Sequence, residues 1–349
     1  MLLQALKEPG QSWGAAVRFV YFTHSLGSCW NHGNAHFVRG VLRELLARGH
    51  DASSSTNLPD IDTILDKADV VLVHDWNDPA LIAAIGKRRK HGRGFVLLFH
   101  DTHHRGISDT DAVHRLDLSG YDGVLAFGDA LAEVYRRTGW GARVFTWHEA
   151  ADTRLFCPPA VEQHREGAVW IGNWGDDERS TELQSYLLAP TQELNLPLDV
   201  YGVRYPEHAR EMLRAHGASY RGWPSNASVP QVFSRYMMTV DVPRRDYAQL
   251  LPGIPTIRVF EALACGIPLI CAPWHDSEAL FQPGQDYLLA NCPGKMTDCM
   301  RALKADPALR QSLAQHGLAT IRSRHTCGHR VDQLLAIVER LTAVQQVAA

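Results

Sequence analysis

Short apolar runs, separated by segments of helical periodicity, recur along this whole chain and constrain its fold more than any other feature. The runs cover residues 17–22, 70–73, 95–99, 123–127 and 144–147 in the first part, and 168–171, 198–201, 238–242 and 268–271 in the second. Runs that are apolar throughout are typical of strands with both faces covered. Because helical segments alternate with them, we expect an α/β fold with parallel sheets.

The clearest helical segment is 34–48, which ends before Gly49. Its apolar residues recur at helical spacing on one face. They are Phe37, Val38, Val41, Leu42, Leu45 and Leu46.

The length of 349 residues and the two sets of strands predict two domains. We expect one Rossmann-like doubly wound domain over residues 1–150 and a second over 151–328, joined through a proline-bearing segment. A final helical segment, 329–349, is expected to cross back to the first domain. Ligands of open α/β sheets bind beyond the carboxyl ends of the strands, so two facing sheets predict one cleft between the domains.

Composition excludes several classes of protein. The formal net charge of -3 argues against a broad basic face, so we expect no general binding of nucleic acid. The seven cysteines form no CxxC pair, which favours a reducing compartment over a disulfide framework. The first residues lack a signal-peptide pattern, and no run approaches the roughly 18 apolar residues of a membrane span. We expect a cytoplasmic protein, for which a peripheral membrane contact stays open.

The most informative motif follows the strand candidate at 238–242. A loop rich in glycine and proline leads to a short helical segment that ends at Gly266. Pro255 or Thr256 is suited to begin this helix, and the amides around Thr256 and Ile257 would then face the cleft. The positive end of a helix dipole suits a diphosphate.

Two charged residues of this segment, Arg258 and Glu261, lie one helical turn apart. A carboxylate there can accept hydrogen bonds from a ribose diol, and a guanidinium can bind a phosphate. Equally, the two side chains can form a purely structural ion pair.

The other candidates for binding a nucleotide or its phosphates end or follow strands of the second domain. Glycine at 172 would let the backbone approach a phosphate, and the strand end at 201–204 would border a nucleotide base. Of two adjacent arginines after 238–242, at least one is expected to be structural, and Arg179 is either a further cation or a solvated residue. These strand-end candidates are Gly172, Asn173, Tyr201, Arg204, Arg244 and Arg245.

Histidine-rich segments raise the question of a metal. His100, His103 and His104 do not share one side of a strand, and no HExxH motif or paired Cys/His set occurs. His325, Cys327 and His329 are expected to pack at a helix boundary. We expect no metal and no cofactor.

The run FEALACGIPLI, at residues 260–270, resembles the core signature of the group 1, family 4-like glycosyltransferases of the GT-B fold. The resemblance extends in order over most of the chain. It is closest to the CgeB-like, spore-maturation type, through WIGNWGDD, VYGVRYP, YRGW, VPRRDY, LPGIPTIRVFEALACG and RHTCGHR. It implies a ribose contact for Glu261 and diphosphate contacts for the amides near Thr256 and Ile257. The family usually has a second glutamate eight positions earlier, where this chain has Gly253, and that departure puts donor choice and stereochemistry in question.

The resemblance makes the first domain the acceptor side. His24, Gly33 and Asn34 lie in or after its first polar loop, where Asn34 also suits a plain helix cap. His100 would bind a sugar hydroxyl, and Asp101 would act as base if the reaction inverts. If the reaction retains configuration, the leaving diphosphate would help to deprotonate the acceptor.

Segment 147–156 would cross between the domains. Within it, Glu149 and Asp152 suit a hinge or a contact with substrate.

The function implied is a metal-independent glycosyltransferase that moves a sugar from a nucleoside diphosphate donor to a glycan, lipid-linked, protein or small-molecule acceptor. One rival is a nucleotide-sugar epimerase or hydrolase on the same fold, which would convert the donor alone. Another is a non-catalytic nucleotide-sugar-binding scaffold. The absence of GxGxxG and GxxxxGK[ST] motifs argues against a nicotinamide dehydrogenase and a P-loop kinase.

Overall fold

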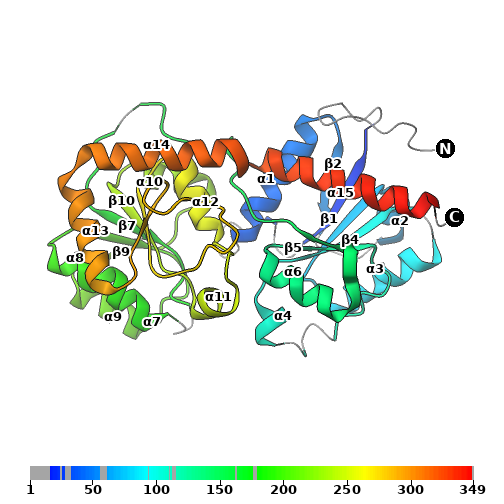
Figure 1. Cartoon of the computed structure of the whole chain (residues 1–349), viewed down its shortest axis with the longest axis horizontal. Coiled ribbons are helices and arrows are strands. Elements are labelled where there is room, and N and C mark those ends of the chain that lie inside the picture. Colours follow the sequence, from blue (N-terminus) through cyan, green and yellow to red (C-terminus); the bar gives the residue numbers. More distant parts are fainter. Residues whose placement is uncertain are drawn as a thin grey trace.

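Two parallel sheets of six strands each organise the chain into two units that lie side by side (Figure 1). The structure is a computed structural model that describes residues 16–23, 26–27, 33–55, 61–92, 94–109, 111, 115–161, 163–175 and 179–347. Both sheets are parallel throughout, as the alternation of strands and helices predicts.

The first sheet has the strand order β2-β1-β3-β4-β5-β6. Its strands are β1 (Arg18–Phe22), β2 (Asp51–Ser55), β3 (Val70–His74), β4 (Val96–Asp101), β5 (Gly123–Ala126) and β6 (Val144–Thr146). The helices around it are α1 (Gly33–Ala47), α2 (Ile61–Asp66), α3 (Pro79–His91), α4 (Arg105–Ser108) and α6 (Asp129–Tyr135), with the short segments η1 (Arg136–Trp140) and η2 (Gly141–Arg143).

The second sheet has the order β12-β11-β10-β7-β8-β9. Its strands are β7 (Ala168–Ile171), β8 (Leu198–Tyr201), β9 (Ser219–Tyr220), β10 (Met238–Asp241), β11 (Leu269–Cys271) and β12 (Leu288–Leu289). Its helices are α7 (Ser180–Leu183), α8 (Ala189–Glu193), α9 (Glu207–Ala215), α10 (Val229–Phe233), α11 (Arg245–Leu250), α12 (Ile257–Ala264), α13 (Pro293–Ala305), α14 (Pro307–Arg324) and α15 (Cys327–Val347), with η3 (Gln184–Leu188) and η4 (Asn226–Ser228).

All nine apolar runs expected to be strands are strands, with ends that differ by at most two residues. The three strands that the pattern missed, β2, β9 and β12, lie at sheet edges. β2 has the sequence DASSS, and β9 and β12 have two residues each. Short edge strands need few apolar residues, so their sequences give no strand signal.

Alternate residues of each strand belong to apolar clusters on opposite faces of the sheet. In β1, Phe19 and Tyr21 join one cluster that continues into the second unit, whereas Val20 and Phe22 join a cluster on the other face of the first sheet, which also reaches Leu251 and Ile254. The continuous cluster includes Trp147 of the connecting segment and Phe260 of α12. The two units therefore share an apolar core and are not simply tethered.

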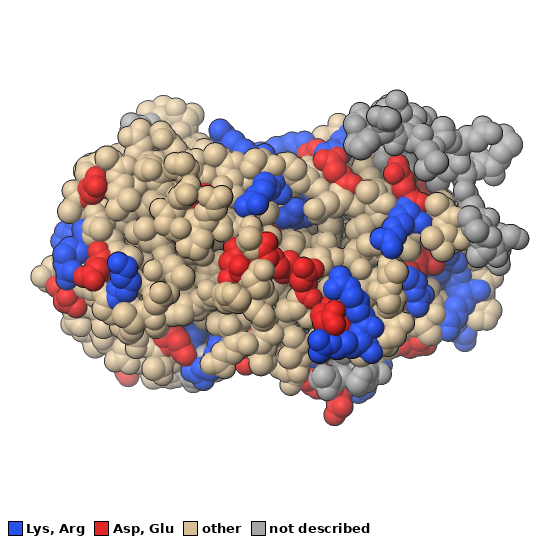
Figure 2. Space-filling view, viewed as in Figure 1, with Lys and Arg blue, Asp and Glu red and all other residues tan. Residues whose placement is uncertain are grey.

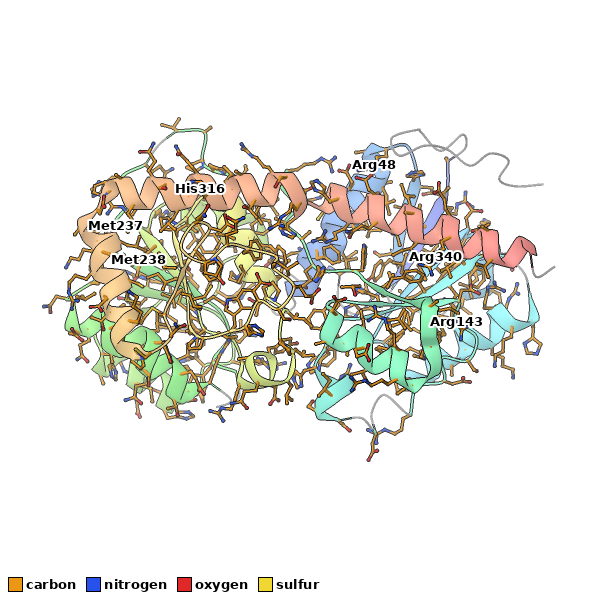
Figure 3. All side chains as sticks on the ribbon, in the orientation of Figure 1. Arg48, Arg143, Met237, Met238, His316 and Arg340 are labelled. Atoms are coloured by element: carbon orange, nitrogen blue, oxygen red, sulfur yellow. The ribbon has the colours of Figure 1, made fainter. Side chains whose placement is uncertain are left out.

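The last helix, α15, crosses from the second unit onto the first, where it packs against α1 (Figure 1). Arg48, just past the end of α1, donates to Asp332 Oδ1 at 2.5 Å and to the carbonyl of Gly328 (Figure 3). Arg340, further along α15, lies over the ring of Phe145, with 5.4 Å from its guanidinium carbon to the ring centroid. These contacts fasten the end of the chain to the first sheet.

Surface charge is mixed on the face seen in Figure 2, where groups of acidic and basic side chains lie close to one another. None of the helices in the described part of the chain is long and apolar enough to span a bilayer.

The order of strands reverses at one place in each sheet. In the first sheet this switch lies between β1 and β3, and in the second it lies between β7 and β10. Ligands of such sheets bind beyond the strand ends at this switch point. The loops after β7 and β10 are therefore where the fold directs the search for a site.

Candidate functional site

A cavity of about 420 Å³ lies between the two units, at the carboxyl ends of the strands. Its first-unit wall and the connecting segment provide His36, Trp76, Thr102, His103, Phe127 and Glu149. Its second-unit wall is formed by Trp170, Ile171, Gly172, Asn173, Arg179, Arg204, Asn226, Asp241, Arg244, Tyr247, Thr256, Ile257 and Arg258. Seven of these residues, all on the second unit, are predicted from the sequence to bind a nucleotide or its phosphates.

The loop after β7 brings backbone to the cavity. Gly172 is required there because a Cβ atom would lie 2.8 Å from the indole of Trp170. Asn173 accepts a hydrogen bond from the backbone of Val203 at 3.3 Å, which joins this loop to the one after β8. Arg179 donates to the carbonyls of Asn173 and of Val242, the latter at 2.9 Å. Arg179 is therefore a buried organiser of both switch-point loops as well as a cation at the cavity.

The two adjacent arginines after β10 point to different places. Arg244 lines the cavity, whereas Arg245 is the first residue of α11 and makes a bidentate contact with Glu182 at 2.9 and 3.2 Å. The Arg245 side chain lies in a separate surface cavity, together with Glu182. Arg244 thus lies at the cavity between the units, whereas Arg245 forms a surface ion pair with Glu182.

The start of α12 reaches the cavity as the motif predicts. Thr256 precedes the helix in an extended conformation, and Ile257 is its first residue. The Thr256 hydroxyl does not cap the helix; it donates instead to Asp241 Oδ1 at 3.2 Å. The backbone N–H of Ile257 is bound by the carboxyl of Glu149, which comes from the connecting segment. The helix start is therefore capped across the interface between the units.

Glu261 does not line the cavity, since its side chain is 0% exposed. Arg258 Nη1 donates to its Oε2 at 2.5 Å, and the His36 ring donates to its Oε1. Burial raises the pKa of this carboxyl, but Arg258 and His36 outweigh that effect and hold the pKa below its ordinary value. The structural ion pair between Arg258 and Glu261 is present, and a ribose contact would need one of these partners to move.

Glu149 is the opposite kind of carboxyl. It is 4% exposed, lines the cavity, and its Oε1 atom has no hydrogen-bond partner among the described residues. Burial, and then the charge of Glu261, raise its pKa to about 8, although the Ile257 amide works in the opposite direction. Glu149 is therefore a neutral acid near pH 7, beside an ionised Glu261.

The first-unit candidates at the end of β4 lie behind the cavity wall. His100 is 0% exposed and shares a hydrogen bond with Tyr21 through Nδ1, while its Nε2 has no partner among the described residues. Asp101 is 3% exposed and accepts from Tyr135 at 2.7 Å and from the backbone of His103 at 3.0 Å. Neither side chain lines the cavity, whereas Thr102 and His103, the next residues along, do.

A charged and aromatic group surrounds His103. Arg105 donates to Asp75 Oδ2 at 2.7 Å and lies 4.5 Å from the ring centroid of Trp76. Burial and the nearby His104 lower the pKa of His103 to about 3, so this imidazole is neutral. Burial, and then the charge of Asp75, raise the pKa of Asp101 to about 7. Asp101, behind the first-unit wall, can therefore gain or lose a proton near neutral pH, whereas His103 in the wall stays neutral.

Three further predicted residues have other surroundings. Pro255 lines a very small neighbouring cavity, and the Tyr201 hydroxyl faces that of Tyr236 at 3.5 Å. Gly33 is the first residue of α1, and Asn34 follows it in the helix, where its side chain is not described. His24 lies outside the described residues.

Gly253 occupies the position where the resembling family carries its first glutamate. Its φ of +85° favours glycine, and a Cβ atom there would lie 2.6 Å from Ser277 Oγ and 2.9 Å from the Glu278 side chain. Glu278 in turn accepts from the backbone of Asp129 at 2.8 Å and binds His148 at 2.7 Å. A glutamate at 253 does not fit this arrangement, because Glu278 fills the space and uses it to join the two units.

The histidine and cysteine run near the start of α15 serves packing. His325 contacts the Leu280 carbonyl and Arg330, both at 2.9 Å, and His329 binds the Thr326 hydroxyl at 2.7 Å. Cys327 lies directly under Gly40 of α1. Within the described part of the chain, no three His, Cys, Asp or Glu side chains gather where they could hold a metal ion.

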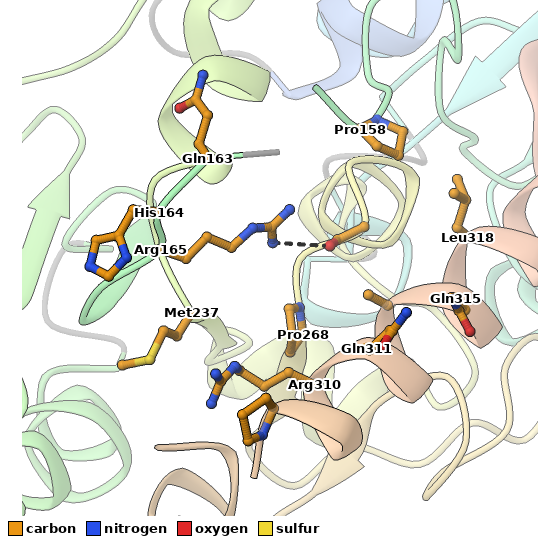
Figure 4. Close-up of a pocket in the computed structure, with 13 residues that line it drawn as sticks. Pro158, Gln163, His164, Arg165, Met237, Pro268, Arg310, Gln311, Gln315 and Leu318 are labelled. Carbon is orange, nitrogen blue, oxygen red and sulfur yellow. Dashed lines mark hydrogen bonds between the residues drawn. The ribbon is translucent and has the colours of Figure 1, made fainter. Parts of the chain in front are cut away.

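A larger cavity, of about 850 Å³, lies at the opposite end of the second sheet (Figure 4). Met237 and Pro268, which line it, immediately precede β10 and β11, so it faces the amino ends of the strands. Arg165 in its wall donates to the carbonyl of Gly266 at 3.2 Å. We place the candidate site in the smaller cavity, because that one lies at the switch point and collects residues from both units.

Sequence reasoning missed several residues of the interdomain cavity. Asp241 is the last residue of β10, and burial raises its pKa to about 6. Asn226, Tyr247 and His36 also line the cavity but follow no strand directly. The strand-end rule would have found Asp241, whereas no local signal marks the other three.

Comparison with known proteins gives a family match over part of the chain and a fold over nearly all of it. A family model described as glycosyl transferase-like matches residues 179–336, and no curated protein matches the chain. Sucrose-phosphate synthase from Thermosynechococcus elongatus is 14% identical, with a TM-score of 0.68 over 94% of this chain and 100% of that one. The catalytic domain of starch synthase IV from Arabidopsis thaliana, solved with ADP and acarbose, is 10% identical, with a TM-score of 0.68 over 94% and 100%.

A third structure, the T4 phage enzyme BGT in complex with its UDP-glucose substrate, is 9% identical, with a TM-score of 0.60 over 92% of this chain and 99% of that one. These likenesses span nearly the whole chain, which confirms the expected arrangement of two Rossmann-like units facing across a cleft. The chain therefore has the GT-B fold, and its residues 179–336 are similar to a glycosyl transferase-like family.

Proposed function

We propose that this protein transfers a sugar from a nucleoside diphosphate donor that binds in the cavity between the two units. The observation that supports this most is the group of four arginines, Arg179, Arg204, Arg244 and Arg258, that line this cavity together with the start of α12. Guanidinium groups and helix-start amides are the protein groups best suited to phosphate oxygens. Structural neighbours solved with UDP, ADP or UDP-glucose support a nucleotide as the ligand class.

Within this proposal, the diphosphate lies against Arg244 and the start of α12 near Thr256. Gly172 and Asn173 then approach it from the loop after β7, and Arg204 borders the base. Glu261 acts by holding Arg258 in the cavity wall, because both of its oxygens are bound by side chains. A direct ribose contact, as the resemblance implies, requires His36 to move away on donor binding.

The acceptor side is the first unit, where His103 lines the cavity just after β4. Asp101 accepts the backbone N–H of His103, so we propose that Asp101 positions His103 and holds negative charge near the reacting atoms. His100 supports the same wall from behind through Tyr21 and Trp147, with its ring 4.9 Å from that of Trp147. If the reaction inverts configuration, Asp101 is the base in this proposal. If it retains configuration, the leaving diphosphate takes that role.

The finer assignments are part of the proposal as well. We propose a metal-independent enzyme of the CgeB-like subgroup, with a glycan, lipid-linked, protein or small-molecule acceptor. The six cysteines in the described residues are free thiols, which agrees with a reducing compartment such as the cytoplasm.

The test is titration calorimetry of the protein with UDP, GDP, dTDP and CDP, each with and without EDTA. We expect one diphosphate to bind selectively and EDTA to leave its affinity unchanged. Loss of binding in EDTA would contradict metal independence, and binding of none of the four would contradict the donor site.

The same experiment continues with the sugar derivatives of the nucleotide that binds. A transferase releases diphosphate at a substantial rate only when an acceptor is present, whereas an epimerase or hydrolase converts the donor alone. The scaffold alternative draws on Gly253, which leaves the site without the family's first glutamate. It predicts tight binding with no conversion in any mixture.

A further inference from the structure

Glu149 is a buried carboxyl at the cavity that the proposed function does not yet use. It is 4% exposed and comes from the segment that connects the two units. Its backbone carbonyl accepts hydrogen bonds from Arg330 of α15 at 3.3 and 3.4 Å. The position of this residue is therefore fixed by the helix that fastens the two units together.

The two carboxyl oxygens of Glu149 have different surroundings. The carboxyl accepts the backbone N–H of Ile257, the first amide of α12. The Oε1 atom is buried and has no hydrogen-bond partner among the described residues. A buried carboxyl oxygen without a partner is costly, unless it carries a proton or meets a ligand group.

The charges around Glu149 come from several elements. Glu261 of α12 acts on it directly and disfavours its ionised form, whereas Arg258 and His36 face Glu261 instead. Tyr247 of α11 and Tyr21 of β1 also lie near it, and burial raises the pKa of both phenols, so they stay neutral. Arg330 binds its backbone and not its carboxyl. On these elements the Ile257 amide alone favours the ionised form of Glu149, and burial together with Glu261 outweighs it.

We propose that Glu149, as a neutral acid, is a ligand for the donor's diphosphate: one oxygen accepts the Ile257 amide, and the other donates its proton to a phosphate oxygen. In this arrangement the acid extends the donor end of α12 into the cavity. A carboxylate in the same place would repel the diphosphate, so binding couples to protonation. The inference rests on the proposed function, because it assumes that a diphosphate binds at the start of α12.

The direction of the pH dependence follows from the raised pKa of about 8. Below that pH Glu149 already holds the proton, so diphosphate binding needs no proton uptake. Above it the proton must be taken up from solution, and affinity falls by about tenfold for each pH unit. Ionisation of the diphosphate itself does not contribute to this change in affinity above pH 8, since its last pKa lies near 6.

The experiment uses the nucleoside diphosphate that binds best among UDP, GDP, dTDP and CDP. Calorimetry at pH 7 and pH 9, in two buffers of different ionisation enthalpy, gives the affinity and the number of protons taken up. For the wild-type protein we expect an affinity about tenfold lower at pH 9 and an uptake approaching one proton there. This measurement needs no variant.

The Glu149→Gln variant keeps a donor group but cannot ionise. We expect it to bind at both pH values with the wild-type affinity of pH 7 and to take up no proton. Glu278→Gln is the matched control, because this carboxyl also joins the two units, through His148 and Asp129, but does not line the cavity. It is expected to keep the wild-type pH dependence.

Two results overturn the inference while leaving the proposed function intact: a wild-type affinity that is equal at pH 7 and pH 9, or a fall that persists in Glu149→Gln. Absence of diphosphate binding by the wild-type protein at pH 7 would instead overturn the proposed function. The two failures are thus distinguishable.

Discussion

The buried acids on the two sides of the interdomain cavity have pKa values shifted in opposite directions. On the second unit, the acid Glu261 is bound by Arg258 and His36 and its pKa is lowered, so the wall keeps its charges ionised. On the first unit and the connecting segment, burial raises the pKa of Asp101 to about 7 and that of Glu149 to about 8. One wall is built to hold an anion, and the other has protons that can be gained or lost near neutral pH.

The difference follows from where the cations are. Arg179, Arg204, Arg244 and Arg258 all come from the second unit, while Arg105 on the first unit is engaged with Asp75. A transferase needs this division, because the donor brings negative charge and the acceptor hydroxyl must lose a proton. Four substitutions would break or sharpen the comparison.

The largest effect is expected for Glu261→Ala, which removes the ionised acid of the second wall. Arg258 would lose its partner in a helix whose residues are all buried except Arg258 itself. His36 would lose the hydrogen bond to Glu261 that joins the two units. Breaking a buried ion pair costs about 3–5 kcal/mol. Urea unfolding should show this loss in the free energy of unfolding.

Glu182→Ala is the control for Glu261→Ala, because it breaks the pair with Arg245, in which both side chains are partly exposed. It should cost less than about 1 kcal/mol. Equal losses for the two variants would mean that Glu261 is not held as an ion pair.

The next effect concerns the first wall. Asp101→Asn removes the charge that accepts the backbone N–H of His103, so turnover should fall about hundredfold while donor affinity stays within twofold. Release of nucleoside diphosphate measures turnover, and calorimetry measures affinity. Asp122→Asn serves as control, since Asp122 accepts the amide of Leu97, the second residue of β4, at the end of the sheet away from the cavity. Full turnover in Asp101→Asn would remove this residue from the mechanism.

The adjacent arginines give a third comparison, within the second wall itself. Arg244→Ala should weaken diphosphate binding by about tenfold or more, as expected for a lost hydrogen bond to a charged group of about 1.5–3 kcal/mol. Arg245→Ala should leave affinity unchanged, because its guanidinium binds Glu182 outside the cavity. Titration calorimetry of both variants measures these affinities. A larger loss of affinity in Arg245→Ala than in Arg244→Ala would place the diphosphate in the surface cavity that Arg245 and Glu182 line.

These arginines also show what the sequence could and could not predict. Apolar runs and glycine positions predicted nine strands, the two units and the α12 loop, because those features depend on local pattern and on the general rule for strand ends. Whether Arg244 or Arg245 faces a ligand depends on α11, which begins at Arg245 and directs that side chain toward Glu182. The pattern contains no such information.

The β4 end and the connecting segment show the same limit. The sequence marked His100 and Asp101, yet the cavity begins one residue later, at Thr102, because the strand runs on to Asp101 with both side chains buried. The hydrogen bond from the Ile257 amide to Glu149 joins residues 108 positions apart. The sequence left a hinge and a substrate contact open for Glu149, and this tertiary contact cannot be read from a local pattern.

The smallest effect is expected for Tyr135→Phe, which removes the hydroxyl that donates to Asp101 at 2.7 Å. That hydrogen bond lowers the pKa of Asp101, against the larger effect of burial, so its loss raises a pKa that already lies at about 7. If the ionised form of Asp101 supports turnover, activity rises with pH through this pKa, and the rise should move to higher pH by less than about one unit. The fall in diphosphate affinity above pH 8 belongs to Glu149 and should stay where it is. A profile in which the lower limb does not move, in a variant that folds and binds donor normally, would show that the first wall does not set the pH dependence of turnover through Asp101.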